Sequence, residues 1–171
     1  MMGKITMTIF IILFLVTQVV AQKKIPNVEI KTLDGKIFNT DSINRMGKPV
    51  FLSFWATWCV PCMKELDAIN ENIEDWKDEV DFIVVAVSID DQRSTNRVAP
   101  LVNGKGWDDF VVLTDPNSNF KRAMNIVNVP HSMLLDKNGQ VVWQHTSYSE
   151  GDEFHLFELI KKVAANEEIK E

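Results

Sequence analysis

The feature that most constrains the fold is an abrupt change of hydrophobic periodicity within residues 50–76. The run VFLSFW, from Val50 to Trp55, is almost continuously apolar and has a β-branched and an aromatic residue at its ends. Such a run is typical of a strand buried on both faces of a sheet. The apolar positions that follow are spaced by three and four residues, as on one face of a helix, and they are Cys62, Leu66, Ile69, Ile73 and Trp76. The segment therefore predicts a buried strand that leads directly into an amphipathic helix.

The rest of the chain alternates between strand and helix patterns in the same way. Further strands are expected at 28–31, 36–39, 82–89, 111–114, 133–135 and 141–144, with Asp34-Gly35 and Asp136-Lys137-Asn138-Gly139 as hairpin turns. Further helices are expected at 93–103, where Gly104 and Gly106 follow, at 120–125 and at 149–165. This order predicts an α/β fold in which a central mixed β-sheet carries helices on both faces.

The last of these helices has a start pattern of its own. Ser149 and Asp152 have the spacing of a variant capping box, so the helix is expected to begin at Ser149. Its apolar area is expected to come from Phe154, Phe157, Leu159 and Ile160.

The first 21 residues have the pattern of a secretory signal peptide. Lys4 gives a basic start, the 16 residues from Ile5 to Val20 carry no charge, and Ala21 precedes a polar break. The alternative is an uncleaved membrane anchor, although a spanning helix needs about 20 apolar residues. We therefore expect a signal peptide or anchor at 1–21 and one domain at 22–171, exported to the periplasm or another extracytoplasmic space.

The charge and the cysteine content narrow the functional classes. The chain carries a formal net charge of −6, and nucleic-acid binding would require a basic surface. Its two cysteines are Cys59 and Cys62, three positions apart. A disulfide between them closes too short a loop to stabilise the fold appreciably. The spacing therefore favours a redox function over a structural crosslink, and no nucleic-acid partner is expected.

The chemistry of this pair follows from its place at a strand-to-helix junction. Cys59 is expected at the N-terminal edge of the helix and Cys62 one turn further on, with Pro61 in the first turn, where its missing N–H has no cost. The partial positive charge of a helix start stabilises an anion and lowers the pKa of a thiol placed there. Cys59 is therefore the expected nucleophile, and Cys62 is the expected resolving cysteine.

Other uses of the two cysteines remain as alternatives. A zinc site needs four ligands, which two cysteines and three scattered histidines supply poorly, and a c-type haem site needs His where Met63 stands. A non-catalytic metal or copper carrier would combine the cysteines with His131. A peroxiredoxin-like peroxide reductase would need Thr or Ser three residues before the nucleophile, where the chain has Ala56. We expect no bound metal and no cofactor.

The segment Ser53-Phe54-Trp55-Ala56-Thr57-Trp58-Cys59-Val60-Pro61-Cys62 resembles the active site of the thioredoxin superfamily. It is most similar to the exported, TlpA/ResA-like thiol-disulfide oxidoreductases, and the resemblance extends from about Val28 to the final helix. It implies a thioredoxin-like fold in which Arg93 to Thr114 form the helix-and-strand insert of that branch.

The resemblance also implies roles for residues around the cysteines. Val129-Pro130 matches the family's cis proline, which leaves the backbone of Val129 able to pair with an extended peptide. His131 follows it as a candidate substrate contact or an exposed bystander. Trp58 is a candidate for the partner surface, with packing at the core or rim as the alternative.

Glu65 is the third expected catalytic residue, because reductase members of the family have a glutamate at this position. A half-buried carboxyl near Cys62 would have a raised pKa and could accept the proton of that thiol. The alternative is a first-turn glutamate that is favoured by the helix dipole. The chain departs from cytosolic thioredoxin at Ser53, where that protein has a buried aspartate, so proton transfer must involve another residue or be weaker.

Taken with the resemblance, these residues predict an enzyme that reduces protein disulfides outside the cytoplasm, with oxidation as the less favoured direction. Its partners would be protein thiols and disulfides and an electron-donor protein, since the chain has no other cysteine and no nucleotide-binding glycine motif. It would contact a membrane only if the N-terminal segment is retained.

Overall fold

A computed structural model of the chain describes residues 24–169, so the expected signal segment lies outside the described residues. Within 24–169, no helix is both long and apolar enough to cross a membrane. Seven strands of this part of the chain form one sheet in the order β2-β1-β5-β4-β3-β6-β7. They are β1 (Glu29–Thr32), β2 (Ile37–Asn39), β3 (Val50–Trp55), β4 (Ile83–Ser88), β5 (Val111–Thr114), β6 (His131–Leu135) and β7 (Val141–Thr146).

The strand predicted at Val50 to Trp55 is β3, and it lies inside the sheet. It pairs in parallel with β4 and antiparallel with β6, and all six of its residues are buried. Strands β3, β4 and β5 run parallel, whereas β1, β2, β6 and β7 complete the sheet with antiparallel pairs. The mixed sheet expected from the sequence is confirmed.

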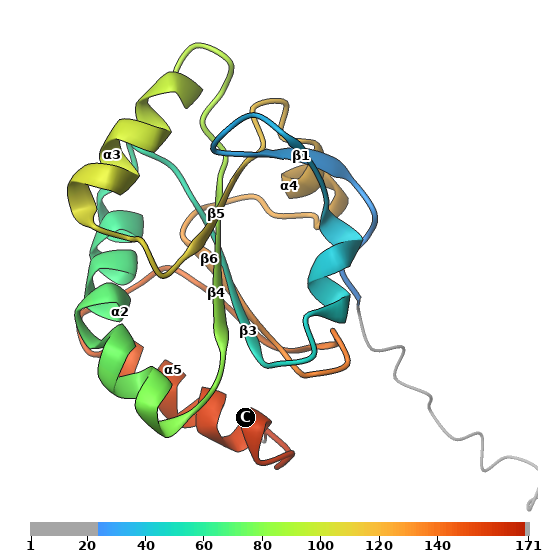
Figure 1. Ribbon diagram of the computed structural model, residues 1–171, viewed down its shortest axis with the longest axis vertical. Coiled ribbons are helices and arrows are strands. Elements are labelled where there is room, and N and C mark those ends of the chain that lie inside the picture. Colours follow the sequence, from blue (N-terminus) through green and yellow to red (C-terminus); the bar gives the residue numbers. More distant parts are fainter. Residues whose placement is uncertain (1–23, 170–171) are drawn as a thin grey trace, which may run out of the picture.

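Helices cover both faces of this sheet (Figure 1). On one side lie α2 (Val60–Glu79), α3 (Val98–Lys105) and α5 (Asp152–Ala164), and on the other lie the 3-10 helix η1 (Thr40–Arg45) and α4 (Asn119–Ala123). Neighbouring residues of β3 therefore pack against different layers. Phe54 contacts Phe120 of α4 at 5.0 Å between ring centroids, whereas Trp55 meets Trp107, after α3, edge-on at 5.1 Å. This arrangement explains why the strand is apolar at almost every position.

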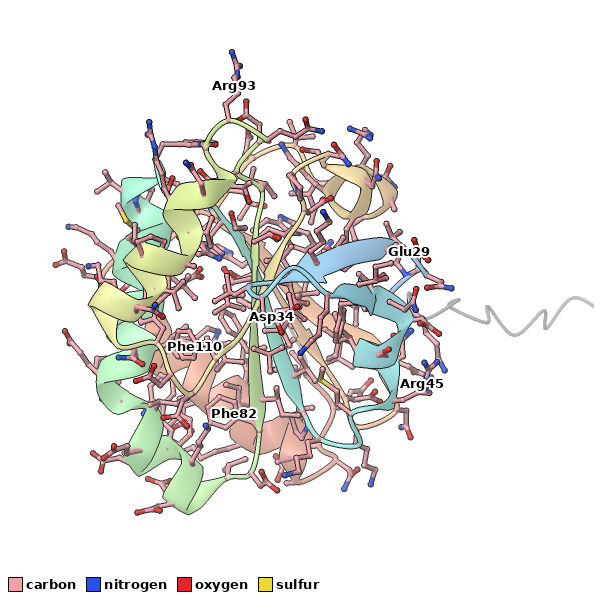
Figure 2. All side chains as sticks on the ribbon, turned by 45° about the horizontal axis from the view of Figure 1, so that its top comes forward. Glu29, Asp34, Arg45, Phe82, Arg93 and Phe110 are labelled. Atoms are coloured by element: carbon pink, nitrogen blue, oxygen red, sulfur yellow. A yellow bond between two sulfur atoms is a disulfide. The ribbon has the colours of Figure 1, made fainter. Side chains whose placement is uncertain are left out.

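The segment expected as one helix at 93–103 is shorter and has a different start. The Asp91 carboxylate accepts hydrogen bonds from the backbone N–H groups of Arg93 and Ser94, which form a turn instead. The Arg93 side chain projects away from the molecule in Figure 2. The 3-10 helix η2 (Thr95–Arg97) follows, and α3 begins only at Val98. Gly104 lies within α3, and Gly106, with φ 66°, ends it.

The expected start of the last helix is also wrong, because α5 begins at Asp152 rather than at Ser149. Gly151 precedes it with φ 103°, a left-handed conformation that favours glycine. Half of the expected capping box is present, since the Asp152 carboxylate accepts the backbone N–H of Ser149 at 2.8 Å. Phe154 does not belong to the buried stripe and is 58% exposed. With the first helical residue at Asp152, the inward face is instead set by Leu156, Phe157, Leu159, Ile160 and Val163.

The expected helix-and-strand insert is docked onto α2 by polar contacts. The Asp67 carboxylate of α2 binds the Lys105 ammonium at 2.6 Å and accepts a hydrogen bond from the Trp107 indole N–H at 3.1 Å. Further along the helix, Lys77 pairs with Asp109 at 2.5 Å. These contacts therefore hold the insert against α2, the helix that begins at the cysteine pair.

Candidate active site

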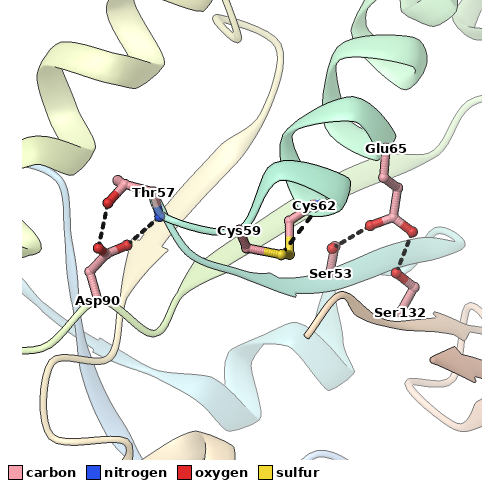
Figure 3. Close-up of a disulfide and its surroundings, with 7 residues drawn as sticks. All are labelled: Ser53, Thr57, Cys59, Cys62, Glu65, Asp90 and Ser132. Carbon is pink, nitrogen blue, oxygen red and sulfur yellow. Dashed lines mark hydrogen bonds between the residues drawn. A yellow bond between two sulfur atoms is a disulfide. The ribbon is translucent and has the colours of Figure 1, made fainter. Parts of the chain in front are cut away.

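The two cysteines lie where β3 passes into α2, at the carboxyl end of the central strands. Cys59 is the N-cap residue of α2 and Cys62 lies in its first turn, and a disulfide of 2.01 Å joins their sulfur atoms (Figure 3). Pro61 is in the first turn of the helix, as predicted. The backbone N–H of Cys62 donates to the Cys59 Sγ at 3.3 Å.

This contact gives the Cys59 sulfur the role that a Ser or Asp oxygen has at other helix starts. An N-terminal N–H of a helix has no partner within the helix, and the helix dipole adds partial positive charge at the same point. Both effects stabilise a negative charge on Cys59 more than on Cys62. The site can therefore hold a thiolate at the residue that comes first in the chain.

Glu65 is buried beside this pair, three residues after Cys62 on the same helix. Its carboxylate accepts hydrogen bonds from the Ser53 hydroxyl at 2.9 Å and from the Ser132 hydroxyl at 2.7 Å. Ser53 of β3 and Ser132 of β6 are paired across the sheet, so both hydroxyls reach the same carboxylate. In Figure 3, Ser53 lies between the disulfide and Glu65.

Burial raises the pKa of Glu65 to about 7, the two serine hydrogen bonds lower it, and the nearby charge of Asp152 raises it. Glu65 also lines a small cleft of about 70 Å³ between β7 and α5, together with Tyr148, Asp152 and Glu153. Tyr148 donates to Glu153 at 2.7 Å, so these groups are linked. Glu65 is thus a buried carboxyl with a pKa near neutrality that lies beside a cleft.

The peptide bond between Val129 and Pro130 is cis, which confirms that prediction. Pro130 immediately precedes β6, whose first residue His131 pairs with Phe54 near the end of β3. The strand register therefore brings the proline to the same edge of the sheet as the cysteines. The half-buried His131 ring has its Nδ1 2.8 Å from the Thr146 hydroxyl of β7. A contact between His131 and a substrate stays a prediction.

Exposed apolar side chains flank the disulfide along the chain, and another lies in the loop before the cis proline. Trp58 is 64% exposed, Val60 in the first turn of α2 is 59% exposed, and Val127 in the loop before Pro130 is 78% exposed. Trp55, by contrast, is fully buried and belongs to the core. Large apolar groups that remain exposed in this way commonly mark a surface for another molecule.

The sequence analysis missed Asp90, a fully buried carboxylate just after β4. It accepts hydrogen bonds from the backbone N–H and the hydroxyl of Thr57, at 2.8 Å and 2.6 Å, and from the Ser88 hydroxyl at 2.8 Å. The only signal in the sequence is that Asp90 and Asp91 directly follow a buried parallel strand, whose carboxyl end is where α/β folds place functional groups. A surface loop has the same pattern, so the sequence alone could not distinguish the two.

Within residues 24–169, no three side chains of His, Cys, Asp or Glu converge in a way that could hold a metal ion. A family model described as the AhpC/TSA family matches residues 21–144 of the chain. The chain belongs to the AhpC/TSA family. This is a thioredoxin-like family, and the thioredoxin-like fold expected from the segment at 53–62 is confirmed.

Relatives of this AhpC/TSA member include thiol-disulfide oxidoreductases. It is 34% identical over 122 residues to the thiol-disulfide oxidoreductase ResA of Bacillus anthracis, covering 71% of this chain and 67% of that one. It is 27% identical over 125 residues to the thiol:disulfide interchange protein DsbE of Yersinia pestis, covering 72% and 62%. The solution structure of a thioredoxin-like protein from Porphyromonas gingivalis matches with a TM-score of 0.74 at 41% identity, covering 83% of this chain and 92% of that one.

Proposed function

We propose that this chain, a thiol-disulfide oxidoreductase, reduces disulfides of proteins outside the cytoplasm with Cys59 as the nucleophile. The observation that carries the proposal is the Cys59 sulfur at the N-cap of α2, where it accepts the Cys62 N–H and forms a disulfide with Cys62. The relatives named ResA and DsbE support the same chemistry.

The reaction is an exchange of two electrons between thiols and a disulfide. The Cys59 thiolate attacks one sulfur of the partner's disulfide, forming a mixed disulfide and releasing the partner's other sulfur as a thiolate. Cys62 then loses its proton and attacks the Cys59 sulfur. The second partner sulfur leaves as a thiolate, and the Cys59–Cys62 disulfide is formed. The partner gains two electrons and this chain is oxidised.

Glu65 is the proposed proton acceptor for Cys62 in the second step. Its raised pKa of about 7 makes the carboxylate a stronger base than an exposed glutamate, while it is still ionised in part at neutral pH. The cleft between β7 and α5 provides a path by which the proton can leave to solvent. The serine hydrogen bonds keep the carboxylate on the side of the helix that faces β3.

The partner is proposed to bind over the exposed apolar surface beside the disulfide. Trp58 and Val127 would contact apolar side chains on either side of the partner's cysteine, and the half-buried Val129 would pair its backbone with that segment in strand-like fashion. Pro130 has no N–H to donate and so cannot bond the Cys59 thiolate. His131 would lie at the end of this surface.

Reduction in an oxidising compartment requires that this chain be reduced again by another protein. Among its 171 residues Cys59 and Cys62 are the only cysteines, so the donor's electrons must enter through the same pair. The expected signal segment at 1–21 supports an extracytoplasmic location, and retention of that segment would add a membrane anchor.

Trapping of mixed disulfides tests the proposal. Cys62→Ser in the native host should accumulate Cys59 disulfides with partner proteins, which mass spectrometry would identify. Cys59→Ser/Cys62→Ser is the matched control and should trap none. Absence of mixed disulfides for Cys62→Ser, together with no reduction of insulin by the dithiol form of the wild type, would refute the proposed activity.

A further inference from the structure

The buried carboxylate of Asp90 is hydrogen-bonded to the turn that leads to Cys59. Both of its oxygens accept hydrogen bonds from Thr57, Oδ2 from the backbone N–H and Oδ1 from the hydroxyl. Ser88 donates to Oδ2 from the end of β4, and the Asp90 N–H returns a hydrogen bond to the Ser88 hydroxyl at 3.1 Å. Asp90 and Ser88 are fully buried, so these bonds are shielded from water.

Thr57 lies two residues before Cys59, within the turn that connects β3 to α2. The Cys59 N–H donates to the Ala56 carbonyl at 3.0 Å, which closes that turn around Thr57. The strand ends are also joined, since the Ile89 N–H donates to the Trp55 carbonyl at 2.8 Å. Residues at the end of β4 therefore hold the turn through which the chain enters α2 (Figure 3).

A purely structural role is the competing explanation, and the molecule offers an example of one. Asp115, at the end of the neighbouring strand β5, accepts the backbone N–H groups of Asn119 and Lys121 and so holds the start of α4. Asp90 differs because two of its three hydrogen-bond donors, the backbone N–H and the hydroxyl of Thr57, belong to the turn that precedes Cys59.

We propose that Asp90 is a positioning residue of the dithiol site, which acts through Thr57 to hold Cys59 at the N-cap of α2. The proposal rests on the proposed function of the Cys59–Cys62 pair. Its physical basis is that the Cys62 N–H can reach the Cys59 sulfur only in one backbone conformation of the turn between β3 and α2. Without the hydrogen bonds to Asp90, the turn adopts other backbone conformations. In these the Cys59 sulfur loses the Cys62 N–H donor and moves away from the partial positive charge at the start of α2.

The test is the thiol pKa of Cys59 in the reduced protein, measured from the rate of iodoacetamide alkylation as a function of pH. Thr57→Val removes one hydrogen bond to Asp90 and leaves the charge of Asp90 in place. We expect it to raise the Cys59 pKa by about one unit, which lowers the thiolate fraction about tenfold below the pKa. Thr57→Ser keeps a hydroxyl at this position, so its Cys59 pKa should equal that of the wild type.

Thr40→Val is the matched control. Thr40 is a fully buried threonine in η1, whose hydroxyl donates to the Pro26 carbonyl at 2.6 Å and accepts the Val28 N–H at 2.9 Å. The same chemical change there should lower the urea midpoint and leave the Cys59 pKa at its wild-type value. A structural role for Asp90 would give Thr57→Val this same pattern, and an unshifted Cys59 pKa in Thr57→Val would therefore overturn the proposal.

If Thr57→Val does not fold, Ser88→Ala takes its place, because it removes the third donor to Asp90. It should shift the Cys59 pKa in the same direction by a smaller amount, and an unchanged value would likewise overturn the proposal. The alkylation measurement does not require turnover. A wild type that fails to reduce insulin would refute the proposed function, whereas an unshifted pKa in an active protein would refute only the role of Asp90.

Discussion

Two buried carboxyls lie on either side of the cysteine pair, and their surroundings differ in kind (Figure 3). Glu65 accepts two hydrogen bonds, both from serine hydroxyls, and it lines a cleft. Asp90 accepts three hydrogen bonds, one of them from the backbone N–H of Thr57, and is fully buried. A hydroxyl can rotate and donate elsewhere, whereas a backbone N–H is fixed in place.

This difference separates two uses of a buried carboxyl in one site. Hydroxyl donors and a cleft leave Glu65 able to take up and release a proton, as its raised pKa indicates. A fixed backbone donor and the absence of exposed surface make Asp90 suited to holding the chain in position. Charge alone therefore does not decide the role of a buried acid, since its donors and its access to water also contribute.

The largest effect is expected from the loss of the Asp90 carboxylate. Asp90→Ala leaves three donors without their acceptor in a buried site, and should lower the free energy of unfolding by about 3–5 kcal/mol in urea denaturation. Asp91→Ala is the control. That aspartate is exposed, where it pairs with Arg93 and accepts the backbone N–H groups of Arg93 and Ser94, so its loss should cost only about 1 kcal/mol. Equal losses for the two variants would contradict the holding role.

Glu65 should instead make stability depend on pH. Its pKa in the folded protein is about 7, above the ordinary 4.5, so the folded state keeps a proton that the unfolded chain has already released. The contribution of Glu65 to the free energy of unfolding is therefore fully present below about pH 4.5 and is lost as the pH rises to about 7. The loss is about 3 kcal/mol in total, at about 1.4 kcal/mol per pKa unit. Urea denaturation of the wild type and of Glu65→Gln should be compared across this pH range. As the pH rises, the free energy of unfolding of the wild type should fall relative to that of Glu65→Gln. A constant difference would contradict the raised pKa.

The resolution step should depend on the same carboxyl. Glu65→Gln cannot accept the Cys62 proton, so release of a partner from a preformed Cys59 mixed disulfide should slow about a hundredfold at pH 7, within the usual range for a general base. The measurement is rapid-quench electrophoresis of the mixed disulfide as a function of pH. Glu71→Gln, on the exposed side of the same helix, should resolve at the wild-type rate. A normal rate and pH profile for Glu65→Gln would remove Glu65 from the mechanism.

The smallest effect should come from trimming a single donor to Glu65. The Ser132 hydroxyl lowers the pKa of Glu65, so Ser132→Ala should raise that pKa further above 7, by about one unit for the loss of one hydrogen bond of about 1 kcal/mol. Carbon NMR of the labelled carboxyl would follow the titration. Ser88→Ala removes a donor to Asp90 instead, and the Glu65 titration should then stay as in wild type.

Much of the site could be predicted from local sequence rules. The run at 50–55 followed by helical spacing predicted the strand, the helix and the position of Cys59 between them, and Pro61 agreed with a first helical turn. The same rules were wrong at the start of α5, because Gly151 adopts a left-handed conformation that the capping pattern around Ser149 did not reveal. Glu65 was expected to be half-buried, because it lies at the edge of the apolar helical stripe. It is buried more completely and accepts hydrogen bonds from two serines that were not predicted as its partners.

The sequence by itself determined the α/β order of elements, the dithiol at a helix start and the class of reaction. These features depend on residues within about one helical turn of one another, where backbone geometry sets the contacts. Only the tertiary structure decided how the acids are used. Thr57 and Asp90 are 33 residues apart and Glu65 and Ser132 are 67 apart, so each pair meets through the alignment of β3 with β4 and β6. Strand alignment is a property of the packed sheet, and a pattern read along one chain does not contain it.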